Sequence, residues 1–217
     1  MRRALGTLLI ALGLLALADA ALTLAWQEPV SALRAARAQH RLAGQLRALE
    51  LATPRRLGDG AHVAADARAA ARSRRDGQAL AELRIPRIGL RTIVVRGATA
   101  ADLRTGPGLL DGSPLPGQRG TVAIAGHRTT YGAPFRHLDA LRRGDVVTLR
   151  LPYATFRYAV EDWRIVQPTD LSVLRRVGHD RLVLSACHPL FSAARRIVVL
   201  ARLVRVGQAA SDLNRSV

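Results

Sequence analysis

The sequence lacks several features that would mark a particular class of protein. Its 217 residues contain one cysteine, Cys187, which excludes an internal disulfide framework and a zinc site with more than one thiolate. It has no repeat period, collagen-like triplet or sustained heptad pattern, so solenoids and coiled coils are excluded. Aromatic residues make up only 4%, and lysine is absent, so all 33 Lys and Arg positions are arginine.

The charge is strongly unbalanced, at +17 with only 16 acidic residues, whereas the 49% hydrophobic content excludes wholesale disorder. Such a balance is typical of nucleic-acid-binding proteins. Here, however, the arginines are scattered, aromatics are few and no nucleic-acid module is visible. We attribute the excess to compositional bias, with attraction to an anionic envelope polymer or lipid surface as a secondary effect.

The amino terminus predicts a transmembrane helix over residues 4–26. The run is apolar apart from Gly, Thr and Asp19, and at about 1.5 Å per residue it is long enough to cross a bilayer core of ~30 Å. Arg2 and Arg3 place residues 1–3 in the cytoplasm and the rest of the chain outside. The alternative is a signal peptide cleaved near Ala20, but the apolar run continues to Trp26.

Residues 27–80 are rich in alanine and arginine and poor in large apolar residues. Leucines at roughly helical spacing predict an exposed helix to about residue 52. Pro54 and the Gly58–Gly60 cluster interrupt it, and a second Ala/Arg stretch covers 64–75. We interpret this segment as a stalk that holds a domain away from the membrane.

Residues 81–206 contain short β-branched runs separated by turn residues, which indicates a β-rich domain. Residues 207–217 are predicted to form a loose polar tail. Thr99 and Asp102 form the pattern of a capping box that opens a short helix, and residues 134–143 predict another. About eight short strands with few helices indicate a closed or nearly closed β-barrel. The predicted strands are 83–85, 88–90, 92–95, 121–125, 146–151, 155–166, 181–185 and 197–206.

Cys187 and His127 are the first candidates for chemistry because each follows an apolar strand. Cys187 is either a reactive thiol or a small buried hydrophobic residue. A cysteine nucleophile needs a proton acceptor, and an imidazole supplies one near neutral pH. The other five histidines are weaker candidates, and His188 is too close to Cys187 in the chain for easy direct pairing.

Arg196 begins the last predicted strand, nine residues after Cys187. A strand, a loop and an antiparallel strand would bring the two together, and a guanidinium stabilises the negative charge that develops on an attacked carbonyl. Arg195 competes, since side chains alternate faces along a strand. We expect no metal and no cofactor, because the histidine and cysteine spacings match no compact ligand pair. A papain-like fold is disfavoured because His127 precedes Cys187.

Six segments together resemble the sortase family, most closely class E of high-GC Gram-positive actinobacteria. They contain the histidine, cysteine and arginine in family order, together with a first strand and helix like the family's. These segments are Leu83–Leu90, Asp102–Gly108, Thr121–Phe135, Leu138–Asp145, Leu182–Pro189 and Ser192–Ile197.

The resemblance implies a closed eight-stranded sortase-like β-barrel and a cysteine transpeptidase. Such enzymes cleave secreted proteins within a C-terminal Leu-Pro-x-Thr-Gly or Leu-Ala-x-Thr-Gly sorting motif, between Thr and Gly. They form an acyl-thioester and pass it to a peptidoglycan-precursor amine. Carried across, the roles make Cys187 the nucleophile, His127 the general acid and base, and Arg196, rather than Arg195, the stabiliser of the carbonyl and oxyanion.

Two further positions are expected to shape substrate binding. Tyr131 follows the His127 strand and is a candidate for contact with the second motif residue. Ala186 stands where the family usually has threonine, so a hydroxyl near the oxyanion is missing. The expected partners are sorting-motif proteins, a wall-precursor amine and the membrane, without nucleic acid. A noncatalytic module that binds the envelope is the alternative function.

Overall fold

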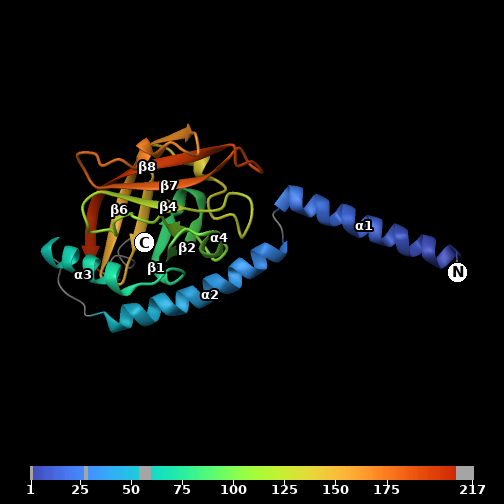
Figure 1. The fold of residues 1–217 in the computed structure, drawn as a ribbon, viewed down its shortest axis with the longest axis horizontal. Coiled ribbons are helices and arrows are strands. Elements are labelled where there is room, and N and C mark those ends of the chain that lie inside the picture. Colours follow the sequence, from blue (N-terminus) through green and yellow to red (C-terminus); the bar gives the residue numbers. More distant parts are fainter. Residues whose placement is uncertain (1, 27–28, 54–59, 209–217) are drawn as a thin grey trace.

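The computed structural model describes residues 2–26, 29–53 and 60–208, and a β-barrel forms its centre (Figure 1). Eight strands close in the order β1-β2-β3-β4-β7-β8-β6-β5, which confirms the expected eight-stranded barrel. The strands are β1 (Ala79–Ile85), β2 (Leu90–Arg96), β3 (Gly108–Leu109), β4 (Thr121–Ala125), β5 (Val146–Arg150), β6 (Ala154–Val166), β7 (Arg181–His188) and β8 (Arg195–Gln208).

The three long helices precede the barrel in the chain, and the short helices lie between its strands. Three are α-helices of the amino-terminal region, one is a short α-helix between strands, and three are 3₁₀ turns. They are α1 (Arg2–Trp26), α2 (Pro29–Ala52), α3 (Gly60–Ser73), α4 (Ala100–Leu103), η1 (Pro86–Ile88), η2 (Leu138–Ala140) and η3 (Leu171–Leu174). The predicted capping box is confirmed at α4, where Thr99 and Asp102 bond reciprocally.

The strand pairing brings segments that are distant in the chain to one edge. β4 and β7 run parallel to each other. In the chain, the 55 residues 126–180 lie between the end of β4 and the start of β7. β7 then pairs antiparallel with β8, and β8 with β6. β5 and β6 pair antiparallel as a hairpin. Each residue at the end of β4 therefore has neighbours on β7 and, one strand further, on β8.

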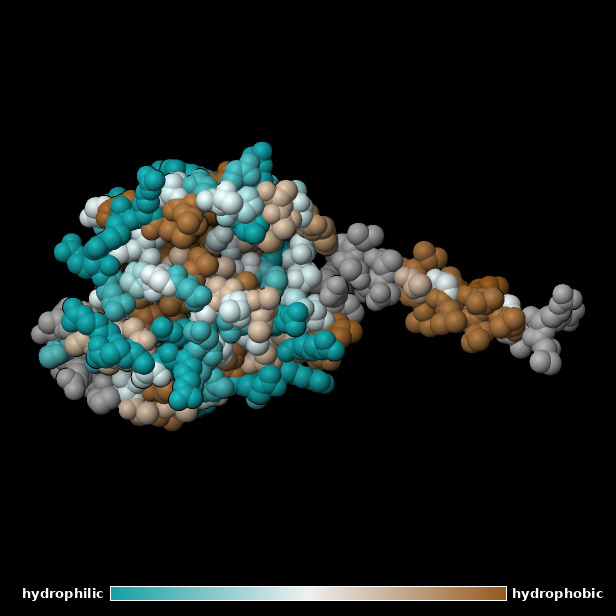
Figure 2. Space-filling model, viewed as in Figure 1, coloured by the Kyte–Doolittle hydropathy of each residue, from teal (hydrophilic) through white to brown (hydrophobic). Residues whose placement is uncertain are grey.

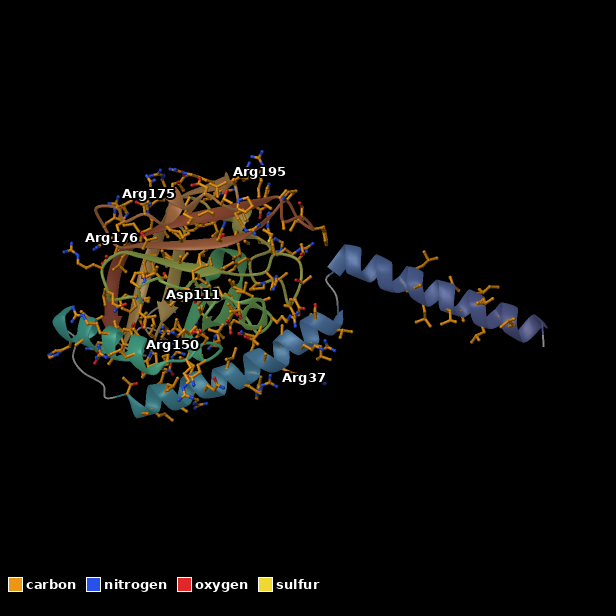
Figure 3. All side chains as sticks on the ribbon, in the orientation of Figure 1. Arg37, Asp111, Arg150, Arg175, Arg176 and Arg195 are labelled. Atoms are coloured by element: carbon orange, nitrogen blue, oxygen red, sulfur yellow. The ribbon has the colours of Figure 1, made fainter. Side chains whose placement is uncertain are left out.

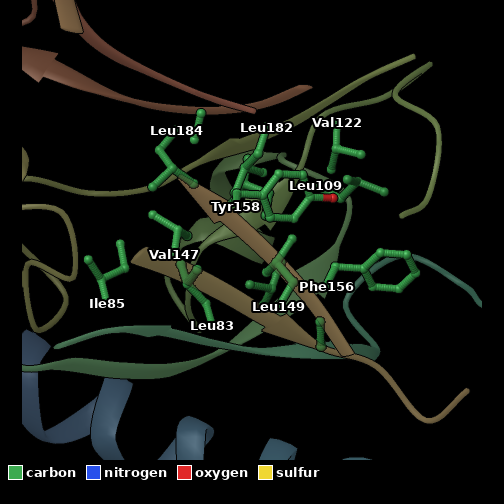
Figure 4. Packing of buried hydrophobic residues seen from close by; sticks show 14 of the residues in the cluster. Leu83, Ile85, Leu109, Val122, Val147, Leu149, Phe156, Tyr158, Leu182 and Leu184 are labelled. Carbon is green, nitrogen blue, oxygen red and sulfur yellow. The ribbon is translucent and has the colours of Figure 1, made fainter. Parts of the chain in front are cut away.

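The barrel interior is filled by apolar side chains that alternate along the strands (Figure 4). Phe156 and Tyr158 on β6, Leu182 and Leu184 on β7, and Leu83 on β1 are all essentially inaccessible to solvent. Fully burying a side chain of this size contributes about 1.5–3 kcal/mol, so this cluster is the main source of stability. It fixes the register of the strands, because a slip of one residue would turn these side chains outward.

The segment predicted as a stalk packs against the barrel instead of standing apart from it. Leu42 and Leu46 of α2 lie against Ile93 and Val95 of β2, and α3 contributes Val63 and other residues to the barrel cluster. In Figure 1, α2 and α3 run along one side of the barrel. The physical reason is that β2 buries consecutive residues, so that Ile93 and Val95 on its outer face, together with Ala79 of β1, are apolar and need a cover.

Gln39 fastens α2 to the barrel through its side-chain amide. Its Oε1 accepts from the Ile93 backbone N–H at 2.6 Å and from Thr92 Oγ1 at 2.9 Å. Its Nε2 donates to the Ile93 and Thr105 carbonyls at 3.0 and 2.8 Å. The Gln39 amide thus donates and accepts at β2 as the backbone of a neighbouring strand would, and its oxygen and nitrogen each make two hydrogen bonds.

Two local expectations were wrong. The predicted strand at 88–90 begins as the 3₁₀ turn η1, because Pro86 stands at its first position and Gly89 ends it with a left-handed φ of 63°. The predicted helix over 134–143 contains only η2. The Phe135 N–H bonds to the His127 carbonyl at 3.0 Å, which holds the chain in consecutive turns instead of a continuous helix.

α1 extends away from the barrel, and its described side chains between residues 5 and 18 are largely exposed (Figure 1). Figure 2 shows them as a hydrophobic surface, unlike the mixed surface of the visible barrel face. Within the described part of the chain, no helix meets the length and hydropathy of a membrane span, so the predicted transmembrane helix is not shown. Most of the predicted tail, from 209 to 217, lies outside the described residues.

Candidate active site

The three residues proposed for chemistry come from the ends of adjacent strands. Ala125 of β4 is in register with Ser185 of β7, and His127 and Cys187 each lie two residues further along these parallel strands. Cys187 is directly opposite Arg196 on the antiparallel strand β8. The topology therefore brings together positions 127, 187 and 196. The sequence predicted that 187 and 196 would be close through a strand, a loop and an antiparallel strand, and it associated His127 with them by its chemistry and by resemblance.

Strand alternation places Cys187 and Arg196 on the outer face of the barrel wall. Their neighbours Ala186 and Ile197 belong to the interior cluster, whereas Val183 and Val198 pack in a separate outer cluster. Successive side chains of a strand point to opposite faces, so Cys187 shares its face with Val183. The thiol is half-buried, and it is the sole free cysteine.

The same register separates Arg196 from Arg195. Arg195 pairs with His188 rather than with Cys187, and its side chain is exposed at the upper edge of the barrel in Figure 3. The Nη1 atom of Arg196 donates to the carbonyls of Ala193 and Arg195 at 2.9 and 3.0 Å. These bonds hold the guanidinium in the loop between β7 and β8, and the geometry favours Arg196 as the neighbour of the thiol.

The backbone around His127 is tightly held. The Gly126 N–H donates to the Ser185 carbonyl at 3.0 Å, and the His127 carbonyl accepts from Phe135 N–H at 3.0 Å. A Cβ atom at position 126 would lie 2.7 Å from the Phe135 ring, which is closer than real contacts allow. Glycine is therefore required at position 126, and the backbone that carries the His127 side chain is held in one position.

His127 is half-buried, and burial lowers the pKa of its imidazole below the usual value. The guanidinium of Arg104 lowers this pKa further by charge repulsion. Both effects favour the neutral imidazole at pH 7, which can accept a proton. The ring of Tyr131 lies 5.0 Å from the imidazole, measured between centroids, and is tilted by 39°.

Tyr131 therefore lies beside the imidazole, as a position that lines the site should. Its backbone has a positive φ of 52°, and its N–H donates to the Ser31 hydroxyl of α2 at 3.2 Å. This contact joins α2 to the loop after β4. Sequence reasoning missed it because nothing in an Ala/Arg-rich helix indicates which loop it will contact.

Ala186 points into the barrel interior, where 3% of it is exposed, on the face opposite to Cys187. Any contact with substrate therefore has to be made by its backbone, and its role in substrate binding stays a prediction.

Two further side chains lie beside the site: Arg128, which was not singled out in the sequence, and His188, which was set aside as a weaker candidate. Arg128 follows His127 and is 3% exposed, and its Nη1 lies 2.7 Å from Nδ1 of His188, the residue after Cys187. The signal available in the sequence was that both candidates for chemistry, His127 and Cys187, are followed directly by a basic residue at the end of a strand. In the described ranges, no group of three or more His, Cys, Asp or Glu side chains is arranged to hold a metal ion.

A closed β-barrel that presents a thiol, an imidazole and a guanidinium at one strand edge defines a class of protein with the groups needed for cysteine-dependent acyl transfer. The model of the Sortase domain matches residues 83–204, which is more than half of the chain. The chain belongs to the sortase family.

Its relatives come from two groups of that family. The chain is 32% identical over 133 residues to Sortase D of Bacillus subtilis, covering 59% of this chain and 65% of the relative. It is 28% identical over 144 residues to Sortase SrtE1 of Streptomyces coelicolor, covering 59% of this chain and 41% of the relative. The chain thus spans less than two thirds of the length of either protein.

Solved structures agree with this assignment. Sortase E from Streptomyces avermitilis superposes with a TM-score of 0.57 at 32% identity, covering 62% of this chain and 93% of that one. A Clostridium perfringens Sortase D5 transpeptidase gives a TM-score of 0.65 over 78% and 99%, and at 20% identity it supports the fold alone. The expected resemblance to sortases, including class E, is confirmed.

Proposed function

We propose that this protein is a cysteine transpeptidase that cleaves a C-terminal sorting motif of the Leu-Pro-x-Thr-Gly or Leu-Ala-x-Thr-Gly type between Thr and Gly. The proposal rests on one observation above the others: Cys187 is in register with Arg196 and lies at the same level as His127. Family membership supports the same reaction, because sortases are cysteine transpeptidases.

The proposed reaction has two acyl transfers. The sulfur of Cys187 attacks the threonine carbonyl, and the thiol proton is held by His127 and passed to the leaving glycine amine. The C–N bond breaks, which leaves an acyl-thioester on Cys187. An amine of a peptidoglycan precursor then attacks this thioester, gives up its proton to His127, and releases the thiol. The net change is the exchange of one amide for another.

Arg196 is proposed to stabilise the oxyanion that forms in both steps. Its two bonds to loop carbonyls are made by Nη1, and a guanidinium carries further N–H groups on Nε and Nη2. A cation held by its own loop requires little reorganisation when negative charge appears, and this is the basis of electrostatic stabilisation.

We further propose that residues 4–26 hold the protein at the membrane as a single-pass anchor, with the barrel on the extracytoplasmic side. The supporting features are the exposed leucines of α1, such as Leu9 and Leu15, and the arginines that precede them. Protease added to intact cells tests this location: the barrel is expected to be digested, and a barrel protected until lysis would contradict it.

Intact-mass detection of the acyl-enzyme tests the activity. The full chain in detergent is incubated with peptides carrying each motif, with and without an amine. We expect a mass increase equal to the acyl fragment that disappears when amine is added, and no increase in Cys187→Ala. This variant is a sharp control because the chain has no other cysteine.

The absence of an adduct with either peptide, together with a Cys187 that a thiol reagent cannot reach, would overturn the proposal. If Cys187→Ala also bound anionic wall polymer as tightly as the parent chain, the envelope-binding module would be favoured instead. The charge of +17 is the observation behind that alternative.

A further inference from the structure

A second pair of side chains lies at the same two strand ends as His127 and Cys187. His188, the last residue of β7, shares a face with the interior residue Ala186, since the two are separated by two positions. Arg128 reaches the same side, because its Nη1 lies 2.7 Å from His188 Nδ1. His127 and Cys187 thus lie on one face of the strands. Arg128 and His188, which directly follow them in the chain, are bonded to each other on the opposite face.

The guanidinium of Arg128 is held on three sides. Its Nη2 pairs with the Asp139 carboxylate at 3.0 Å, and its Nε donates to the Arg136 carbonyl at 3.3 Å. Its side chain is only 2% exposed, whereas that of Asp139 is 51% exposed. A buried charge that loses a partner is costly, so these contacts keep the guanidinium in one position.

The chemistry of the two groups fixes the direction of their hydrogen bond. Arginine carries only donors and stays protonated, so Nδ1 of His188 has to accept. His188 is therefore in its neutral form with the ring proton on Nε2. An asparagine at this position would offer Oδ1 close to where the imidazole offers Nδ1, which makes the bond open to a conservative replacement.

The backbone ladder between β4 and β7 stops before it reaches the chemical residues. The last paired residues are Ala125 and Ser185, and the Gly126 N–H donates one further hydrogen bond to the Ser185 carbonyl. Beyond that point, the bond between Arg128 and His188 connects the two strand ends. We propose that Arg128 is a positioning residue that, through His188 Nδ1, sets the separation between His127 and Cys187. This inference rests on the proposed transpeptidase function.

The test compares His188→Asn with His188→Leu in the full chain. The two replacements have similar size, but only asparagine keeps an acceptor for Arg128. We expect His188→Leu to lower kcat for acylation by about 10- to 100-fold with KM within about twofold of the parent, because misplaced reacting groups slow the chemical step and not binding. His188→Asn is expected to keep kcat within about threefold by the same reasoning.

Two more variants separate positioning from stability. Asp139→Asn removes the carboxylate charge beside Arg128 but keeps an amide oxygen that can accept from it, so it should lower the thermal midpoint and lower kcat much less than His188→Leu does. Arg128→Lys keeps a cation beside Asp139 but loses the planar fork, and we expect about a tenfold loss of kcat at constant KM. This variant decides the matter if His188→Leu does not fold.

The inference is overturned if His188→Leu retains the parent kcat, or if His188→Asn loses as much as His188→Leu. Failure of the transpeptidase function itself would show differently, as a parent chain without an acyl adduct. In that case the alkylation rate of Cys187 by iodoacetamide is measured instead. It should fall in His188→Leu and not in His188→Asn, and equal rates would overturn the inference.

Discussion

The two faces of strands β4, β7 and β8 differ in what they do. Their inner faces bury a continuous apolar cluster that includes Ile124, Leu184 and Val199. At one end of their outer faces lie the half-buried His127, Cys187 and Arg196. One alternating pattern of side chains therefore supplies both stability and chemistry. Substitutions on one face should therefore change the free energy of unfolding, and those on the other should change turnover.

The largest effect is expected at the imidazole. His127→Gln should lower kcat/KM by up to ~10⁴-fold, because the proton acceptor of the first step and the donor to the leaving amine are both lost. His137→Gln is the matched control, since His137 is exposed and lies outside the site. Peptide cleavage followed by mass spectrometry measures both. Equal losses in the two variants would show that His127 has no role of its own in proton transfer.

A substitution on the inner face should show the opposite pattern. Leu184→Ala removes a fully buried side chain and should lower the free energy of unfolding by about 2–5 kcal/mol. Urea denaturation of this variant and of Cys187→Ala, which lies three positions along the same strand, makes the comparison. A Cys187→Ala variant as unstable as Leu184→Ala would contradict the separation of roles.

The neighbouring arginines of β8 test the register directly. Arg196→Ala should lower kcat by about 10²–10³-fold, as the loss of one oxyanion donor does in other enzymes. Arg195→Ala should leave kcat within about twofold, because its side chain points away from Cys187 and, as an exposed arginine, contacts no reacting atom. The reverse result would mean that strand alternation does not govern this edge.

The contact between α2 and β2 should contribute to stability and little to chemistry. Gln39→Ala leaves the amide and carbonyl of Ile93 without their side-chain partners, so it should lower the free energy of unfolding by about 1–3 kcal/mol. Arg37→Ala, on the exposed face of the same helix, is the control (Figure 3). If both variants unfold at the same urea concentration, Gln39 does not fasten α2.

The smallest effect concerns the charge near the imidazole. Arg104→Gln should raise the pKa of His127, but the pKa should stay below the usual histidine value because burial, the larger cause, remains. An NMR titration of the imidazole measures this. Since the native pKa is depressed, the unfolded chain binds more protons between that pKa and about 6.5, so stability falls as pH drops through this window. The variant should leave the upper end of this window, which the unfolded chain sets, unchanged and should raise its lower end, so that less stability is lost on acidification. An unchanged titration would exclude the influence of Arg104.

Much of the barrel could be predicted from residue patterns. The alternation in residues 155–166 and the apolar runs at 121–125 and 181–185 each matched a strand, because burial on one or both faces leaves a period that is visible locally. The short turns were less predictable. The 134–143 segment has the composition of a helix, but a hydrogen bond from Phe135 to the His127 carbonyl holds it as turns.

The packing of the amino-terminal helices could not be predicted from their amino-acid composition. The prediction of a helix that ends at about residue 52 agrees with α2, but its interpretation as a spacer did not anticipate that Leu42 and Leu46 cover β2. Alanine-rich helices show little amphipathic contrast, so a few leucines can dock a helix without a strong periodic signal. The run of apolar residues in β2, which includes Ile93 and Val95, was the better clue, because consecutive buried residues need cover on both sides of the strand.

By itself, the sequence determined which residue types were available: a single thiol, an imidazole after one strand, and two arginines before another. It also determined the β-rich class, because local alternation follows from burial. Only the tertiary structure decided that Cys187 stands opposite Arg196, that Ala186 points inward, and that Arg128 joins His188. The reason is that pairing between β4, β7 and β8 depends on contacts between segments far apart in the chain, and such contacts leave no local period.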